Sequence, residues 1–301
     1  MKGWILYKRC KNELTDFDHG VNHLLSAAET MNIELEVLRP DQFDLMSALP
    51  GAIRLNGQMA QLPDFVIPRI GADTPVFALA LIRQLETEGV YSANSALAIE
   101  RVKDKFCVNQ LLAAKGLPVP KTMLLQLPPP LDWIEQEIGF PLIMKTITGA
   151  RGIGVHLCDN INSFNDILGL FQSTHPPRLL VQQMIASSYG RDLRVLVLGG
   201  KIIGCMLRKA KNSFKANYSL GGDVALFPMT PEIEGLALAA TEIVGLELCG
   251  IDLLFGEHGL VICEANSSPG FKGMELAGGE NIAEKILQYI VTQVASRKVR
   301  A

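Results

Sequence analysis

The closing part of the sequence constrains the fold most strongly, because two strand-like runs flank a Gly-Glu-His-Gly sequence at residues 256–259. Such a spacing predicts a β-hairpin. Side chains alternate across a strand, so Glu264 and Asn266 point the same way, and the hairpin places Asp252 beside Glu264 to within one residue of register. Three oxygen ligands suit a Mg²⁺ ion that arrives with a nucleotide polyphosphate. A polar-faced edge hairpin without an ion accounts for the same pattern equally well.

The length of 301 residues predicts two or three packed units that share a large core. Hydrophobic residues at 48% and charged residues at 20% are typical of a soluble globular protein. The net charge of −3 gives no general reason to expect nucleic acid or an anionic membrane as a partner, and no run is long enough to cross a bilayer. The N-terminus lacks a signal-peptide pattern and the six cysteines are scattered, so we expect a cytoplasmic protein with reduced thiols.

The opening of the chain alternates short apolar strands with helical patterns. That alternation is typical of βαβ units and predicts a parallel sheet in an N-terminal α/β domain at residues 1–93. Asn94 and Ser95 then cap another helix, whose apolar residues continue to Phe106. The predicted strands of the first domain are residues 3–7, 34–38 and 65–69, and its predicted helices are residues 21–31 and 75–88.

The remainder divides into two further lobes. Strands at 141–145 and 153–157 form a hairpin with a glycine-rich tip, and a strand at 179–185 completes a central lobe at residues 94–185. Strands at 193–198 and 201–207 join the closing hairpin in an antiparallel C-terminal lobe at residues 186–301. This lobe also carries a helix that begins after Thr230 and ends at Gly245, and a last helix at 281–296.

A lysine at a strand end, Lys145, directly precedes the glycine-rich turn at residues 149–154. Glycines let backbone N–H groups approach phosphate oxygens, and the lysine adds a point charge. The turn is neither a Walker A sequence nor a Gly-x-Gly-x-x-Gly turn, so the common nucleotide folds are disfavoured. On local sequence alone, a tight turn made by Gly149 and Gly152 explains the glycines at least as well.

Several cations accompany the acidic hairpin. Lys105 lies on the helix that begins near Ser95, and Arg208 and Lys215 flank the end of an apolar strand. Cations beside magnesium ligands are what a triphosphate and its transferring phosphoryl group need, because that chemistry is mostly positioning and charge neutralisation. The alternative is an ordinary mixed-charge surface, which the joint occurrence of both features disfavours.

Other chemistries receive little support from the sequence. It contains no Gly-x-Ser-x-Gly or His-Glu-x-x-His motif, and its five histidines show no ligand spacing. Asp16, Asp18, His19 and His23 form a local cluster, which we interpret as the solvated start of a helix. The absence of a Gly-x-Gly-x-x-Gly turn also speaks against a Rossmann dehydrogenase.

Taken in order, these features resemble the ATP-grasp superfamily, and more narrowly the RimK group of ATP-dependent α-L-glutamate ligases. The resemblance covers nearly the whole chain. It implies an α/β fold with α+β lobes, in which an N-terminal parallel-sheet pre-ATP-grasp domain precedes two lobes that enclose ATP. The segments that carry it are residues 64–71, 104–105, 181–185, 190–194, 208–217, 221–222 and 266–270, together with Asp252 and Glu264.

The resemblance also implies a role for each matching residue. Asp252, Glu264 and Asn266 would hold magnesium, with two ions expected and manganese able to substitute. Arg208 would neutralise the transferred phosphoryl group, and Lys145 would act with it. The remaining expected nucleotide contacts are Lys105 and Lys145 on the phosphates, the loop residues Gly149, Arg151, Gly152 and Gly154, the adenine hinge Gln183 and Met184, Asp192 on the ribose side, and Lys215 and Asn217 completing the pocket.

In the family, ATP activates a carboxylate as an acyl phosphate, which an amino group then attacks to form an amide. The first expectation is that this chain adds L-glutamate to the C-terminal tail of a ribosomal protein, as a homo-oligomer, either dimer or tetramer. A relative that joins an amino acid to a small-molecule, free amino-acid or peptide acceptor is the alternative. A non-catalytic ATP-binding regulator on the same scaffold is the alternative of another class.

Some positions depart from the family pattern. Gln183 and Met184 replace the more usual acidic and aromatic hinge pair, Arg151 replaces a neutral residue, and Lys272 stands where an acidic residue is familiar. We hypothesise that the two added cations adjust recognition of an acidic acceptor. Unchanged acceptor preference after neutral replacement of Arg151 and Lys272 would contradict this hypothesis.

Overall fold

The computed structural model describes residues 1–47, 52–71, 75–149, 152–171, 177–211, 213–216 and 221–300. Its N-terminal part contains the predicted parallel sheet, with strand order β2-β1-β6-β7 and parallel pairing throughout. Buried residues on both faces of β1 explain why this sheet needs helices on each side. The elements are β1 (Lys2–Leu6), α1 (His19–Thr30), β2 (Glu34–Leu38), β6 (Phe65–Pro68), α2 (Val76–Thr87) and β7 (Tyr91–Ser92).

A small antiparallel sheet beside this domain was not predicted. It consists of β3 (Phe43–Leu45), β4 (Ile53–Leu55) and β5 (Gln58–Met59). These strands are too short for a periodic hydrophobic pattern. The turn between β4 and β5 is Asn56-Gly57, with φ of 51° and 77°, which is the dipeptide that favours a two-residue hairpin.

The helix predicted after Ser95 is two helices, α3 (Ala96–Lys103) and α4 (Lys105–Ala114). Ser95 caps α3 as predicted, because its side chain accepts a hydrogen bond from the N–H of Ala98. Asp104 interrupts the helix with an extended conformation, and its carboxylate caps α4 by accepting from the N–H groups of Phe106 and Cys107 at 2.9 and 3.0 Å. Lys105 therefore stands at the first position of α4.

The central lobe is a four-stranded antiparallel sheet with order β10-β9-β11-β8. The predicted hairpin is present, because β9 and β10 pair with Lys145 opposite Val155. Two helices cover one face and bury the side chains of Met144 and Val181. The elements are β8 (Thr122–Leu124), α5 (Leu131–Glu137), β9 (Leu142–Thr146), β10 (Val155–Cys158), α6 (Ile161–Leu170) and β11 (Leu179–Gln183).

The C-terminal sheet is antiparallel, as predicted, with order β14-β13-β12-β15-β16. The helix α7 on one of its faces begins at the cap residue Thr230 and ends at Gly245, whose φ of 76° favours glycine. The elements are β12 (Arg191–Leu198), β13 (Lys201–Lys209), β14 (Asp223–Leu226), α7 (Pro231–Val244), β15 (Leu248–Phe255), β16 (Leu260–Asn266), α8 (Lys272–Leu276) and α9 (Ile282–Arg300).

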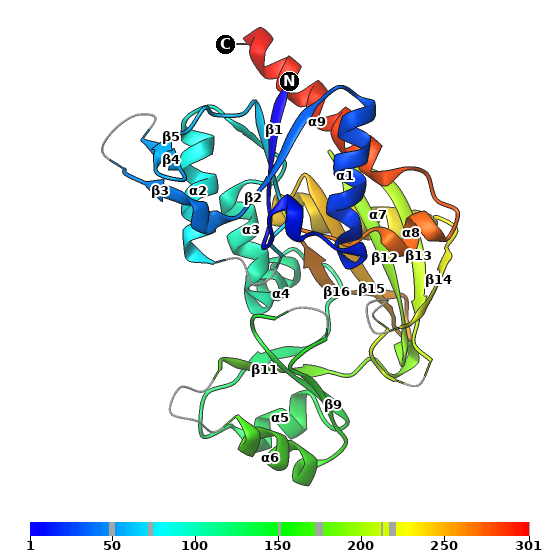
Figure 1. Ribbon diagram of the computed structural model, residues 1–301. Coiled ribbons are helices and arrows are strands. Elements are labelled where there is room, and N and C mark those ends of the chain that lie inside the picture. The colour runs from blue at the N-terminus through cyan, green and yellow to red at the C-terminus, as the bar shows by residue number, and fades with distance from the viewer. Residues whose placement is uncertain are drawn as a thin grey trace.

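The last helix, α9, packs against α1 and so lies beside the N-terminal domain. Ile282, Ile286, Ile290 and Val294 are all buried, as their helical spacing predicted. They share one core with α1 and with Leu196 of β12, so the N-terminal domain and the C-terminal sheet pack through α1 and α9. Figure 1 shows α1 beside α9, with β9, β11, α5 and α6 forming a separate layer at the opposite end of the molecule. The lobe boundaries after residues 93 and 185 stay predictions.

The six cysteines are all free thiols, in agreement with the scattered spacing. Burial raises the pKa of Cys158 to about 11 and the pKa values of Cys205 and Cys249 to about 12. In the part of the chain that the structure describes, no helix is both long enough and apolar enough to cross a membrane.

Candidate functional site

A β-bulge in β16 turns the predicted ligands toward one face of the C-terminal sheet. In the β15–β16 ladder Asp252 pairs with Glu264 and Leu253 pairs with Ile262, so Cys263 is the extra residue. Strict alternation would place the Glu264 side chain on the same face of the sheet as Ile262. The extra residue shifts the alternation by one position, so that Glu264 lies on the opposite face. The predicted pairing of Asp252 with Glu264 is confirmed. The side chains of β16 that are buried in the core beneath α7 are Leu260, Ile262 and Ala265.

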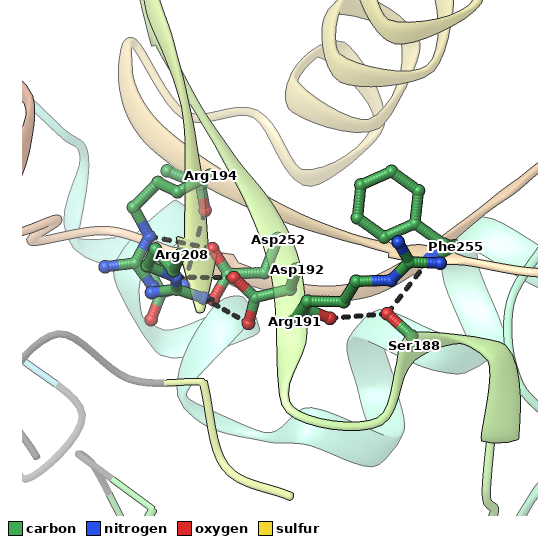
Figure 2. A network of polar contacts seen from close by, with 9 residues as sticks. Ser188, Arg191, Asp192, Arg194, Arg208, Asp252 and Phe255 are labelled. Atoms are coloured by element: carbon green, nitrogen blue, oxygen red, sulfur yellow. Dashed lines mark hydrogen bonds and ion pairs between the residues drawn. The ribbon is translucent and has the colours of Figure 1, made fainter. Parts of the chain in front are cut away.

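Asp252 lies in a network of ion pairs that Figure 2 shows. Arg194 donates from Nε and Nη2 to the two carboxylate oxygens of Asp252 at 2.7 and 2.6 Å. Arg208 donates from Nε and Nη2 to Asp192 at 2.6 and 2.8 Å, and its Nη2 also lies 2.9 Å from Oδ2 of Asp252. The sheet register causes this arrangement, because Arg194 pairs with Asp252 and Asp192 pairs with Arg208 on neighbouring strands. Two carboxylates and two guanidinium groups thus form one neutral cluster.

The cluster is largely withdrawn from water, since Asp252 is 5% exposed and Arg208 is 3% exposed. Burial by itself raises the pKa of the Asp252 carboxyl, but the positive charges of Arg194 and Arg208 outweigh burial and lower that pKa below its ordinary value. Burial likewise lowers the pKa of the Arg208 guanidinium, and the carboxylates of Asp252 and Asp192 more than reverse this. Asp252 therefore remains an anion that can accept a cation.

Beside this cluster, two further polar contacts fix the strand ends. The hydroxyl of Ser188 donates to the carbonyl of Arg191 at 2.5 Å and accepts from the N–H of Phe255 at 3.0 Å. The Arg191 guanidinium lies 4.6 Å from the centre of the Phe255 ring. Figure 2 shows these two side chains next to each other. These contacts hold the start of β12 against the end of β15.

The central lobe contributes Lys145, which is 7% exposed and lies on the sheet face opposite α5 and α6. Its Nζ donates to Oε1 of Gln182 at 2.9 Å, and Gln182 donates to Oγ1 of Thr122 at 2.8 Å. Burial raises the pKa of the Cys263 thiol to about 11, Lys145 opposes this rise, and Glu264 adds to it. The positive charge of Lys145 thus acts on a thiol of β16, the strand that carries two of the predicted magnesium ligands.

The glycine-rich turn after β9 is tied to α4 and to the C-terminal lobe. Lys105 donates from Nζ to the carbonyls of Ile147 and Gly149 at 3.1 and 2.9 Å, and Lys215 donates to the carbonyl of Gly152 at 2.8 Å. At Gly154 the φ of 71° favours glycine, and an added Cβ would lie 2.9 Å from Oγ1 of Thr146. Lys105, predicted to contact the phosphates, and Lys215, predicted to complete the pocket, are therefore positioned at the predicted loop, and their roles stay predictions.

The segment after Asn266 is held by the N-terminal part of the chain. The side chain of Asn94 donates to the carbonyl of Ser267 at 2.8 Å, and Arg69 donates from both terminal nitrogens to the carbonyl of Pro269 at 3.0 Å. Asn94 is 2% exposed and Arg69 is 9% exposed. Asn266 itself donates to the carbonyl of Gly250 at 3.4 Å. The last predicted ligand thus contacts β15 and directly precedes a segment that Asn94 and Arg69 hold.

Other predicted residues are less closely engaged with this cluster. Glu264 is half-buried, and within the described ranges its carboxylate makes no hydrogen bond or ion pair. The N–H of Gln183 donates to the carbonyl of Lys121 at 2.8 Å in the strand ladder, and Met184 follows β11 directly. Arg151 and Asn217 lie outside the described residues, so their predicted roles remain predictions.

Sequence reasoning missed three residues that shape the site, namely Arg194, Arg69 and Asn94. Arg194 could have been found, because alternation along β12 places it on the same face as Asp192. No local pattern marked Arg69 or Asn94 as a site residue, because their partners lie 200 and 173 residues away in the sequence, although Arg69 lies in one of the segments that carry the family resemblance. Two cavities, of about 270 and 180 Å³, lie elsewhere and are not lined by the predicted residues.

The fold and the site define an ATP-grasp protein, and comparison with known proteins supports this. Residues 102–290 match the RimK-like ATP-grasp domain and residues 17–99 match the RimK PreATP-grasp domain. The probable alpha-L-glutamate ligase 2 of Pseudoalteromonas atlantica is 35% identical over 277 residues, which cover 91% of each chain. The probable alpha-L-glutamate ligase of Legionella pneumophila is 40% identical over 235 residues, which cover 77% of this chain and 78% of that protein.

Among solved structures, the ATP-grasp ligase PsnB in complex with a phosphomimetic variant of its minimal precursor, Mg and ADP superposes with a TM-score of 0.74 at 19% identity. The match covers 97% of this chain and 98% of that one. The chain described here belongs to the RimK-like ATP-grasp family. The predictions of the ATP-grasp fold and of an ATP-dependent ligase are thereby confirmed.

Proposed function

We propose that this protein is a magnesium-dependent carboxylate–amine ligase that adds L-glutamate to the C-terminus of a ribosomal protein through an acyl phosphate. The observation that carries the proposal is the polar face of the C-terminal sheet, where Asp252 and Glu264 pair on the adjacent strands β15 and β16, and Arg208 of β13 reaches Asp252 across β12. The sequence relatives named as probable α-L-glutamate ligases support glutamate as the amine substrate. The Mg and ADP of the PsnB complex support the same cofactors here.

The donor set fits a magnesium ion. Asp252 and Glu264 supply carboxylate oxygens and Asn266 supplies an amide oxygen, and Mg²⁺ binds by one or two carboxylates together with substrate phosphates. Asp252 is anionic because two guanidinium groups lower its pKa, so an arriving cation meets a carboxylate that needs no deprotonation. When bound, the ion supplies charge neutralisation for the phosphoryl group that is transferred.

The chain's own residues perform the remaining tasks in this proposal. Lys145 and Lys105 contribute fixed positive charge at the phosphate loop, and Arg208 neutralises charge on the transferred phosphoryl group. The γ-phosphoryl group passes to the acceptor carboxylate, and ADP leaves. The amino group of glutamate then attacks the acyl carbon, the amide bond forms, and the acyl–phosphate bond breaks to release phosphate.

Amine-dependent release of ADP tests the proposal. Purified protein is incubated with ATP, Mg²⁺, single amino acids and candidate acceptor peptides, and the product is identified by mass spectrometry. We expect ADP release that requires glutamate and a peptide ending in the ribosomal tail sequence. A product with a free amino acid or a small molecule as acceptor would correct the acceptor and leave the ligase assignment in place.

Glu264→Gln is the sharpest variant, because the change removes a charge without disturbing an observed contact. Asp252→Ala is less informative, since it would leave two buried guanidinium groups without their carboxylate. The matched control is Glu257→Gln, an exposed carboxylate in the turn of the same hairpin. We expect loss of turnover in the first variant and unchanged turnover in the control. Nucleotide binding without amine-dependent ADP release would instead indicate a non-catalytic ATP-binding regulator.

A further inference from the structure

We propose that His19, His23 and Glu275 form a binding site for a transition-metal ion of the zinc class, separate from the predicted magnesium site. His19 and His23 are four residues apart on α1, so they lie one above the other on the same face of the helix. Glu275 comes from α8, and Figure 1 shows α8 next to the start of α1. The sequence pattern had been interpreted as a solvated helix start, and the structure adds the third ligand.

The three side chains already converge on one point. Nε2 of His19 lies 2.7 Å from Oε2 of Glu275, and Nδ1 of His23 lies 2.9 Å from the same oxygen. One ligand atom from each residue lies within 4.8 Å of the others, and the two imidazole ring centres are 3.7 Å apart. Tetrahedral zinc with bonds of ~2.0–2.1 Å sets ligand atoms ~3.3 Å apart. The two nitrogen–oxygen distances therefore need to lengthen by about half an ångström to admit an ion.

The surroundings hold these ligands in place. The other carboxylate oxygen of Glu275, Oε1, accepts a hydrogen bond from the N–H of Ile282 at 3.0 Å, which fixes the plane of the carboxylate. The ring of His19 packs edge-on against Phe271 at a centroid distance of 6.2 Å. The side chains of His19 and Glu275 are 15% and 10% exposed, whereas His23 is 45% exposed. An ion can therefore enter from the His23 side, and water can occupy a fourth position there.

The ligand chemistry selects the class of ion. Two imidazole nitrogens and one carboxylate oxygen suit Zn²⁺, Co²⁺, Ni²⁺ or Cu²⁺, whereas Mg²⁺ and Ca²⁺ prefer sets made of oxygen alone. The predicted magnesium ligands are Asp252, Glu264 and Asn266, so the two sites share no residue. A protein with both sites would bind a zinc-class ion in the presence of a large excess of magnesium.

Such an ion would join parts of the chain that are 256 residues apart in sequence. Helix α1 belongs to the N-terminal domain, and α8 begins two residues after Gly270, which follows the segment that Arg69 and Asn94 hold. Binding would therefore fasten α1 to the segment that follows the proposed active site. An ion that binds this site of the folded chain more tightly than it binds the unfolded chain raises the thermal unfolding temperature.

The test is zinc binding by the full-length protein after removal of metals with a chelator. Titration calorimetry is carried out with ZnCl₂ in millimolar Mg²⁺ and a phosphine reductant, and thermal unfolding is followed in parallel. Co²⁺ serves as a spectroscopic probe, because tetrahedral nitrogen and oxygen ligation gives visible absorption without the charge-transfer band of a cobalt–thiolate bond. We expect one equivalent of Zn²⁺ per chain, a higher unfolding temperature with the ion, and the thiolate-free cobalt spectrum.

His23→Gln is the informative variant, because His23 is the most exposed of the three and its replacement least endangers folding. Glu275→Gln tests the second helix independently. The matched control is His258→Ala, an exposed histidine in the turn of the closing hairpin. We expect both site variants to lose the equivalent of zinc and the control to retain it. Displacement of zinc by magnesium, a thiolate band with cobalt, or full zinc binding by His23→Gln would overturn the proposal.

Discussion

Asn94 is a single side chain whose loss should be unusually costly, because it satisfies four backbone groups. Its Nδ2 donates to the carbonyls of Leu248 and Ser267, both at 2.8 Å. Its Oδ1 accepts from the N–H groups of Glu247 and Leu248 at 2.8 and 3.0 Å. With a net contribution of ~1 kcal/mol per hydrogen bond, Asn94→Ala should reduce the free energy of unfolding by ~4 kcal/mol. That is near the upper end for one substitution.

Urea unfolding, followed by tryptophan fluorescence and by circular dichroism, measures this loss. Asn94→Asp retains the acceptor but replaces the donor to two carbonyls with an oxygen, so we expect it to lose at least ~2 kcal/mol. The matched control is Asn22→Ala, a half-buried asparagine that donates once, in a solvent-exposed hydrogen bond to the carbonyl of Thr15 at 2.9 Å. It should lose less than ~1 kcal/mol. A loss below ~1 kcal/mol for Asn94→Ala would refute the reasoning from hydrogen bonds.

Two further predictions concern titration. The folded pKa of Asp252 lies below its ordinary value, so its contribution to stability is complete above the unfolded pKa of ~3.9 and is lost as pH falls through the folded pKa. In the acid range, the free energy of unfolding should therefore depend less steeply on pH in the Asp252→Asn variant than in the unmodified protein. An equal pH dependence in the two proteins would contradict this prediction. Burial raises the pKa values of Cys205 and Cys249 to about 12, so both thiols should react slowly with iodoacetamide at pH 8 in the folded protein and quickly in urea. Peptide mapping measures the two rates, and rapid labelling of either thiol in the folded state would show that the burial argument is wrong.

The elements that the sequence predicted are those whose pattern repeats over several residues. The parallel strands of the first domain, the helix between Thr230 and Gly245, and the last helix all follow from apolar periodicity and cap residues. The small sheet β3–β5 was missed because each strand has at most three residues. The break between α3 and α4 was missed because it depends on one residue, Asp104, whose side chain caps α4. The periodicity of apolar residues contains no information about such a cap.

One part of the candidate site could likewise be predicted from the sequence, and another part could not. The hairpin turn and strand alternation placed Asp252 beside Glu264, but alternation alone puts Glu264 on the face of Ile262. The bulge at Cys263 moves Glu264 to the face that Asp252 occupies. A single extra residue in a strand produces no recognisable sequence pattern, so this bulge could not be predicted. The ion pairs of Asp252 depend on which strands become neighbours, and β12 and β15 are separated by β13, β14 and α7 along the chain. Contacts of that separation follow from topology, which local patterns do not determine.

The ion-pair network also bears on how the proposed ligase would receive its nucleotide. Arg208 contacts Asp192 through both Nε and Nη2, whereas it reaches Asp252 only through the shared Nη2 at 2.9 Å. Asp252 has a second, bidentate partner in Arg194. If the proposed magnesium ion binds Asp252, Arg208 can give up that contact and turn toward a phosphate while Asp192 still neutralises and orients it. We therefore interpret Asp192 as the anchor of Arg208 and Asp252 as its exchangeable partner. A nucleotide-bound structure in which Arg208 leaves Asp192 and stays on Asp252 would contradict this order.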